Sequence, residues 1–325
     1  GRKLCIVAAD TVAASHAATL RSIVRRVFAT PRDGRLPAIT LTVAAAFQAD
    51  PGKAPAMPPT PPIQRGPRAT PRIDLATAAW ERNEFGVGVL SLSRDAVSGA
   101  ETFALDCPPD FVYPEEAHFY DCEEELFQFS GEFHHDEVQP FVAPCYVYRP
   151  IGTVYGHGEG SHRGGIILAS LARERRRFHF QQHPEPWTGH YLVDRLWNPR
   201  PVQPLVIDVD ALAWQPVPQI APGAALRPLR GVPGLCNTGS GASAHSPWAA
   251  DAAFVLRLPH GYDGSAPHWP GFELEVLVLA GRATAAGEPW HRGCYGFDAW
   301  RGRCVVHEPL ELFVRAFAAL PDAAT

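Results

Sequence analysis

The sequence predicts a mainly β chain built from two domains of related sequence. Residues 73–80 are echoed by residues 207–214, at an offset of 134 residues. After residue 73, short β-type runs alternate with Gly, Pro, Asp and Asn, and helical periodicity is nearly absent. This texture is typical of an antiparallel barrel or sandwich. The chain has 325 residues, which is room for two domains of roughly 150 residues each.

The repeat continues beyond its first block. Phe103, Leu105, Pro108 and Phe111 recur as Phe254, Leu256, Pro259 and Tyr262, at an offset of 151. His118, Gly131, Cys145 and Tyr146 recur as His268, Gly281, Cys294 and Tyr295, at offsets of 150 or 149. The change of offset predicts roughly 17 extra residues in the second copy, which we place in the Gly/Ser-rich segment 231–248.

The first 50 residues have no counterpart in the repeat. Residues 4–9 and 39–47 are predicted strands, and apolar residues from Leu20 to Phe28 form one face of a predicted helix. We expect residues 1–50 to form a small α/β extension, either appended to the chain or completing a neighbour's sheet. Residues 51–72 contain eight prolines and are predicted to be an extended linker.

The remaining domain boundaries follow from the repeat. We place the first domain at residues 73–172, a polar and aromatic connector at 173–204, and the second domain at 205–325. The predicted strands include residues 87–92, 102–105, 126–129, 146–148, 166–168, 253–258, 275–279 and 312–317.

Composition narrows the class of protein. The net charge is −5 and the charged residues are interspersed, which speaks against nucleic acid or an acidic membrane surface as a partner. No stretch approaches the ~20 apolar residues of a membrane-spanning helix. The apolar run 4–9 stops at Asp10, too soon for a signal peptide. Seven cysteines without a CxxC pair fit a reducing compartment, so we expect a cytoplasmic protein.

One motif in the first copy carries candidate chemistry. His118-Phe119-Tyr120 is followed by three residues, Glu124, six residues and Gly131, and later by Pro150-Ile151-Gly152-Thr153-Val154-Tyr155. This pattern resembles the cupin superfamily, whose motifs are His-x-His, three or four residues, Glu, six residues, Gly, and then Pro-x-Gly-x-x-His. Because the motif lies in a repeat, residues 73 to 317 resemble a bicupin. The resemblance implies two tandem jelly-roll β-barrels, each with a cavity for a ligand.

The resemblance also implies a metal site in the first barrel. His118 and Glu124 stand at ligand positions of the family, whereas Tyr120 and Tyr155 stand where histidines are usual. His157 lies two residues after Tyr155 and shares its face if the strand continues, although the flanking glycines could bend the chain. His118, Glu124 and His157 would then form the two-histidine, one-carboxylate set of non-haem iron(II) oxygenases.

We therefore expect one divalent metal ion, iron(II) first, with zinc, manganese, nickel or copper as alternatives. A metal-free first cavity remains open, because a histidine or glutamate in a barrel can equally be a hydrogen-bonded structural group. His134, His135 and His162 are interpreted as rim or loop residues.

The second copy is predicted to be degenerate. His268 keeps the first ligand position, but Pro270 replaces the second histidine and Leu274 stands where Glu124 stands in the first copy. Residues 298–302 lack the Pro-x-Gly turn and its histidine. We interpret His268 and His291 as surface or pocket histidines, and expect this half to stabilise or shape the first cavity.

These observations lead to one functional hypothesis and two alternatives. The first is a metal-dependent bicupin enzyme of dioxygenase type, in which Tyr120 and Tyr155 orient a small organic substrate or transfer protons. The alternatives are a cupin-type isomerase, cyclase or lyase, with or without metal, and a non-catalytic small-molecule binding or sensing protein. A homodimer is expected. Phe127, Phe129, Tyr146, Tyr148 and Trp187 indicate an aromatic or apolar ligand, but could equally fill a barrel core.

Overall fold

The computed structural model describes most of both repeat copies. The described residues are 68, 70–113, 117–135, 140–156, 158–172, 178–180, 191–192, 205–231, 252–267, 269 and 272–318. The predicted extension at residues 1–50, nearly all of the linker, most of the connector and the inserted segment after residue 231 lie outside them.

The first copy is built on a seven-stranded antiparallel sheet. Its strand order is β16-β10-β7-β13-β4-β3-β2. In that order the strands are β16 (Leu205–Asp208), β10 (Cys145–Arg149), β7 (Glu124–Gln128), β13 (Gly165–Leu171), β4 (Glu101–Cys107), β3 (Gly88–Arg94) and β2 (Glu81–Arg82).

Short strands form the other wall of the first barrel. One small sheet has the order β5-β12-β8-β9, and two pairs are β14 with β6 and β11 with β15. Their bounds are β5 (Phe111–Val112), β12 (Gly160–Ser161), β8 (Glu132–His134), β9 (Pro140–Val142), β14 (Phe178–Phe180), β6 (His118–Tyr120), β11 (Thr153–Val154) and β15 (Tyr191–Leu192).

The second copy is built on a nine-stranded antiparallel sheet. Its main order is β1-β23-β21-β24-β19-β18-β17, with β22 on β21 and β20 on β24. The bounds are β1 (Thr70–Asp74), β23 (Cys294–Phe297), β21 (Phe272–Ala285), β24 (Arg303–Ala318), β19 (Ala252–Leu258), β18 (Ala225–Arg230), β17 (Gln215–Pro216), β22 (Glu288–His291) and β20 (Asp263–Ser265).

The two main sheets confirm the repeat read from the sequence. Strand by strand, β16-β10-β7-β13-β4-β3-β2 corresponds to β1-β23-β21-β24-β19-β18-β17. The registers agree as well, because Phe127 pairs with Leu168 in the first sheet and Leu277 pairs with Phe313 in the second. All eight strands predicted between residues 73 and 317 overlap observed strands, and no helix occurs among the described residues, so the mainly β tandem-barrel prediction is confirmed.

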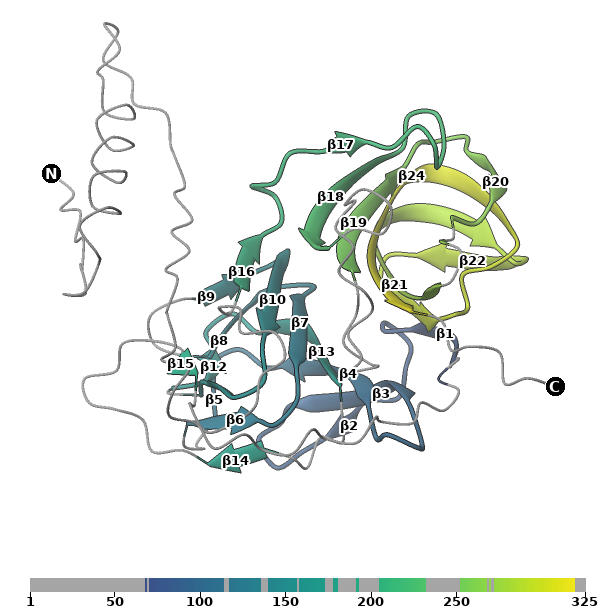
Figure 1. Cartoon of the computed structure of the whole chain (residues 1–325). Coiled ribbons are helices and arrows are strands. Elements are labelled where there is room, and N and C mark those ends of the chain that lie inside the picture. The colour runs from purple at the N-terminus through teal and green to yellow at the C-terminus, as the bar shows by residue number, and fades with distance from the viewer. Residues whose placement is uncertain are drawn as a thin grey trace, which may run out of the picture. The chain divides into compact units, whose positions relative to one another are not determined.

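The first strand of each copy belongs to the sheet of the other copy. β1 pairs with β23 of the second sheet, through Ile73 and Tyr295, and β16 pairs with β10 of the first sheet, through Ile207 and Tyr146. Figure 1 shows β1 against the yellow-green barrel and β16 beside β10. The repeat boundaries at residues 73 and 205 are therefore not the boundaries of the two sheets.

Side-chain alternation along each strand separates three cores. In β7, Leu126 faces the interior of the first barrel, whereas Phe127 faces the space between the two main sheets. The core between the sheets contains residues of both copies, and the rings of Phe127 and Phe313 stack there at 4.1 Å. The third core fills the second barrel. The two barrels are thus joined through a continuous apolar layer.

This layer corrects the interpretation of the aromatic residues of the first copy. Phe127, Phe129, Tyr146 and Tyr148 lie in the core between the two sheets rather than around a ligand cavity. Trp187 lies outside the described residues. The aromatic residues that suggested an apolar ligand instead join the barrels. Among the described residues, no helix is long and apolar enough to cross a membrane.

Candidate functional site

The family motif positions of the first copy converge on one end of its barrel. His118 and Tyr120 lie on β6, Glu124 begins β7, and Tyr155 follows β11. His118 and Tyr155 form an isolated antiparallel bridge, in which each backbone N–H donates to the other residue's carbonyl at 2.8 and 3.0 Å. This bridge holds the two motifs together although they are far apart in sequence.

Glu124 accepts hydrogen bonds on both carboxylate oxygens. Arg149 Nη1 donates to Oε2 at 2.6 Å, and the Tyr155 hydroxyl donates to Oε1 at 3.1 Å. Arg149 ends β10 directly opposite Glu124 in the β7–β10 register, and both side chains are buried. The carboxylate is therefore held by a guanidinium and a phenol inside the barrel.

The buried guanidinium of Arg149 has further donors to offer. Its Nε and Nη2 atoms are buried and have no hydrogen-bond partner among the described residues. The guanidinium also lies over the Tyr155 ring, 3.6 Å from its centroid. Burial tends to lower the pKa of Arg149, but the charge and hydrogen bond of Glu124, with smaller contributions from Tyr155 and Glu159, together outweigh it and raise the pKa above its usual value. The Arg149 guanidinium is therefore a permanently charged cation whose Nε and Nη2 groups could donate hydrogen bonds to a ligand.

Tyr155 is a neutral phenol at the centre of the cluster. Burial, followed by the charge of Glu124 and the neighbouring Tyr120, raises the pKa of Tyr155 well above its usual value. The Tyr155 ring meets the buried His118 ring at a centroid distance of 4.6 Å, and the half-buried Tyr120 ring lies 6.5 Å away. Tyr155 can donate a proton, but a phenolate ligand is disfavoured at this position.

A glycine makes room for His118. Gly156 has φ +96°, and a Cβ built on it would lie 2.9 Å from His118 Nδ1. Its backbone N–H donates to the His135 carbonyl at 3.0 Å. The left-handed backbone and the close ring together require glycine here.

A second polar pair adjoins Tyr155. His135 Nδ1 and Glu159 Oε1 are in hydrogen-bond contact, and both side chains are buried. The His135 ring lies 5.1 Å from the Tyr155 ring. His135 lies in a bend just after β8, in keeping with a loop residue, but it is buried. Glu159 was missed, because only folding brings residue 159 to residue 135.

The described residues of the first barrel do not fit a divalent metal centre. No three donor atoms of histidine, cysteine, aspartate or glutamate from the described part of this barrel lie within 4.8 Å of one another. Glu124 already binds a cation, and a metal ion would have to approach the Arg149 charge. His157 lies outside the described residues, so the set of His118, Glu124 and His157 stays a prediction.

The corresponding region of the second barrel is apolar. Leu274 is buried in its core together with Trp290 and Trp300, whose rings meet edge to face at 4.9 Å. A leucine cannot bind a metal, and two indoles fill space that a ligand would need. His268 and Pro270 lie outside the described residues. The described interior thus agrees with a second copy that lacks the chemistry of the first.

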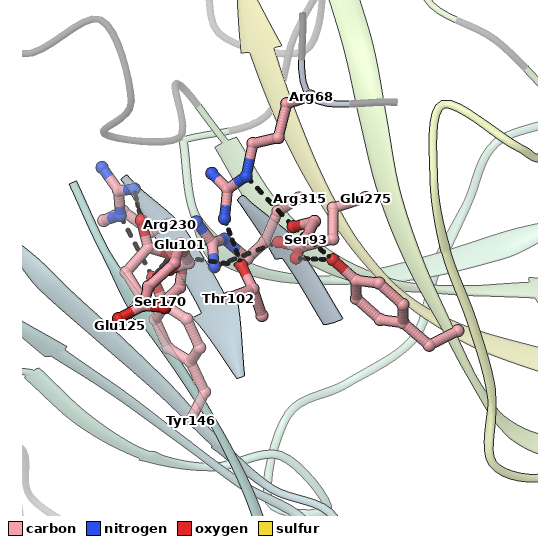
Figure 2. Close-up of polar contacts among 11 residues, drawn as sticks. Arg68, Ser93, Glu101, Thr102, Glu125, Tyr146, Ser170, Arg230, Glu275 and Arg315 are labelled. Atoms are coloured by element: carbon pink, nitrogen blue, oxygen red, sulfur yellow. Dashed lines mark hydrogen bonds and ion pairs between the residues drawn. The ribbon is translucent and has the colours of Figure 1, made fainter. Parts of the chain in front are cut away.

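A buried ionic network of described residues lies between the sheets rather than in a barrel. Glu125 accepts from Tyr146 at 2.8 Å and from Arg230 at 2.5 Å, and Arg315 Nε lies 3.5 Å from it (Figure 2). Burial tends to raise the pKa of Glu125, but Arg230 and Arg315 outweigh it and lower the pKa. This carboxylate is held ionised by residues of both copies.

The second copy contributes a matching group of contacts to the network. Glu275 accepts from Tyr295 at 2.5 Å and lies 3.1 Å from Arg315 Nη1. Tyr295 also donates to Ser93 Oγ at 2.8 Å. Ser93 in turn accepts from Arg68 Nε at 3.0 Å (Figure 2). Because its opposite charges pair with one another and come from both copies, we assign this network to joining the barrels.

Comparison with known proteins identifies the fold. No protein-family model and no curated protein matches the sequence. A solved structure described as a "putative dioxygenase", from Nostoc punctiforme, is similar with TM-score 0.55 and 16% identity, over 78% of this chain and 84% of that one. A "putative glyoxylate induced protein" from Pseudomonas aeruginosa is similar with TM-score 0.53 and 12% identity, over 86% and 99%. At such identities the likeness shows the architecture alone.

Proposed function

Because the chain has the tandem cupin fold, we propose that its first barrel is the site of a small-molecule enzyme that works by acid–base chemistry. The reaction class is that of an isomerase, lyase or cyclase. The substrate is a small organic molecule with a carboxylate or a developing oxyanion. The second barrel supports the first and takes no direct part in the reaction.

One observation carries this proposal. Arg149 is buried and uses Nη1 to bind Glu124, while its Nε and Nη2 have no partner among the described residues. A buried N–H without a partner costs free energy, and a guanidinium offers its donors in the planar geometry that a carboxylate matches. A bound substrate anion would satisfy these donors.

The neighbouring groups supply proton transfer. Tyr155 holds its proton up to high pH and points its hydroxyl at Glu124, so it is a positioned acid beside a fixed carboxylate. His118, which packs on the Tyr155 ring, supplies an imidazole that can accept the proton leaving the substrate. Arg149 would stabilise negative charge that develops on the substrate when a proton leaves carbon. Tyr120 is half-buried.

The test is substrate-proton exchange by chelator-treated protein. A panel of small keto and hydroxy acids is incubated with the full chain in D2O, and deuterium at carbon is measured by mass spectrometry. We expect exchange in at least one substrate, a loss of at least roughly 100-fold in Tyr155→Phe, and no loss in Tyr262→Phe, a second-barrel control. Equal rates in the two variants would contradict the role of Tyr155, and saturable binding without exchange would support a binding protein.

A second candidate is the metal-dependent oxidoreductase, of dioxygenase type, with His118, Glu124 and His157 as ligands and iron(II) as the first choice. It is favoured by the convergence of His118 with Tyr155 and Glu124 at one barrel end. It requires Glu124 to exchange its Arg149 partner for the ion. Near-stoichiometric iron in purified protein, lost in His118→Ala, together with oxygen consumption, would favour this candidate over the first.

A further inference from the structure

Three side chains with metal-binding atoms meet at the edge of the second barrel. Asp74 ends β1, His291 ends β22 and Cys294 begins β23. Their donor atoms all lie within 4.8 Å of one another, and His291 Nε2 is 3.3 Å from Asp74 Oδ2. Within the described part of the chain, no other three histidine, cysteine or acidic side chains come so close.

The chemistry of this set matches zinc. Zinc binds thiolate, imidazole and carboxylate ligands in tetrahedral geometry. Ligand bonds of about 2.0–2.1 Å in that geometry place a nitrogen and an oxygen about 3.3 Å apart. The contact between His291 and Asp74 already has this spacing. Softer or harder cations would favour all-sulfur or all-oxygen sets instead.

Hydrogen bonds hold the Cys294 sulfur in place at this site. Cys294 is fully buried, and its Sγ accepts N–H groups from Arg72 Nη1 at 3.2 Å and from the His291 backbone at 3.4 Å. These contacts fix the sulfur beside His291 and Asp74. Arg72 Nε in turn lies 3.4 Å from Glu288. Asp74 and the thiolate balance a divalent ion, and Glu288 balances Arg72.

The first copy provides an internal comparison. Asp208 pairs with Cys145 in the same register in which Asp74 pairs with Cys294. At an offset of 149, however, Val142 stands where the second copy has His291. Both copies have the aspartate and the cysteine, but only the second has the imidazole that completes three ligands.

The set is separate from the family motif of its own barrel. Leu274, at the motif carboxylate position, accepts a backbone hydrogen bond from Asp298, just beyond the end of β23. Cys294 is at the opposite end of that strand. The first-barrel cluster around Arg149 shares no residue with it.

We propose that Asp74, His291 and Cys294 bind one zinc ion. The fourth position is open to water or another small ligand, because the His291 side chain is 42% exposed. The ion cross-links the exchanged strand β1 to β22 and β23. It therefore stabilises the pairing of this first-copy strand with the second sheet.

The test uses cobalt(II) as a coloured probe on the full chain after removal of metals by chelation. We expect stoichiometric binding with a thiolate-to-cobalt charge-transfer band in the near ultraviolet, which zinc abolishes by displacement. His291→Val, which copies Val142, should lose the band and bind roughly 10-fold or more weakly. Asp74→Asn should also weaken binding, while His307→Ala, an exposed histidine on β24, should leave it intact.

The opposite results are equally informative. The proposal is overturned if the unmodified protein shows no charge-transfer band at stoichiometric cobalt, or if the band is unchanged in His291→Val. Circular dichroism serves as the control for folding of the variants. We expect them to fold, because the side chains of Asp74 and His291 are partly exposed. A band lost in His118→Ala and kept in His291→Val would place the ion in the first barrel and refute this site.

Discussion

At the scale of single residues, the first barrel is governed by the mutual dependence of Arg149 and Glu124. Each is buried beyond the reach of solvent, so each needs the other as a counter-charge. Removing one partner leaves a buried charge, whereas removing both leaves only a change in packing. The pair therefore costs free energy on folding and also gives the barrel its chemistry.

A substitution of Arg149 should reveal this dependence. We expect Arg149→Met to lower the free energy of unfolding by about 3–5 kcal/mol, because Glu124 is left buried without its cation. The double variant with Glu124→Leu, which copies Leu274 of the second repeat, should recover most of the loss. Urea denaturation at neutral pH measures both, and equal stabilities of the single and double variants would contradict a coupled pair.

Gly156 is predicted to be indispensable for the position of His118. In Gly156→Ala the new Cβ would meet His118 Nδ1 at 2.9 Å and the backbone would keep its positive φ. We expect a loss of about 1–3 kcal/mol of stability from strain, with further loss from the displaced ring. Gly287→Ala is the matched control, because Gly287 has φ +82° but nothing within 4 Å of the added Cβ. Thermal unfolding should show the larger loss in Gly156→Ala.

At the scale of elements, the exchanged strands define how the copies are joined. β1 covers the edge of the second sheet beside β23, and β16 covers the edge of the first sheet beside β10. An uncovered edge exposes unpaired backbone groups, so each copy protects the other. The exchange also gives the repeated block at residues 73 and 207 its role. Residue 73 precedes the first barrel but pairs in the sheet of the second, and residue 207 precedes the second barrel but pairs in the sheet of the first.

Hydrogen exchange can test the strand exchange directly. A charge at Ile73 or Ile207 would enter the apolar layer against which both pack, at a cost of roughly 1–3 kcal/mol. Ile73→Asp should speed amide exchange in residues 294–297, the partner of β1, and Ile207→Asp should do so in residues 145–149, the partner of β16. Faster hydrogen exchange only in strands of the copy that carries the substitution, and not in the partner strand of the other copy, would contradict the pairing.

At the scale of the whole molecule, the two barrels should unfold as a unit. Their main sheets share an apolar layer, and the Glu125 network crosses the same interface. Arg230 and Arg315, the cations that hold Glu125 ionised, both come from the second copy. Loss of this carboxylate's charge therefore weakens both barrels at once.

This coupling predicts a stability that falls in acid. The pKa of folded Glu125 is below its usual value, so its contribution is complete above the unfolded pKa of about 4.3 and is lost as pH falls through the folded value. Glu125→Gln should be less stable than the unmodified protein by about 3–5 kcal/mol at pH 7, and this difference should shrink steadily below pH ~4. Urea denaturation across this range measures it, and a difference that grows in acid would refute the assignment.

Much of the architecture was predictable because it depends on local pattern. Short β-type runs between turn residues located the strands, and the repeat offsets aligned β7 with β21 and β10 with β23. The aromatic residues show where this reasoning stops. Phe127 and Tyr146 alternate as barrel residues should, but pattern cannot say whether an apolar face meets a ligand or a second sheet.

The candidate site divides in the same way. The sequence by itself determined which copy carries the candidate chemistry, since Glu124 of the first copy aligns with Leu274 of the second. It also identified His118, Tyr120 and Tyr155 as candidate site residues. Only the tertiary structure decided that Arg149 holds Glu124, that Glu159 joins His135, and that Asp74 reaches Cys294. The spacing of residues along the chain shows which side chains could take part in chemistry. The hydrogen-bonded register between distant strands decides which partners those side chains contact, and the partners determine the charge and chemistry of the site.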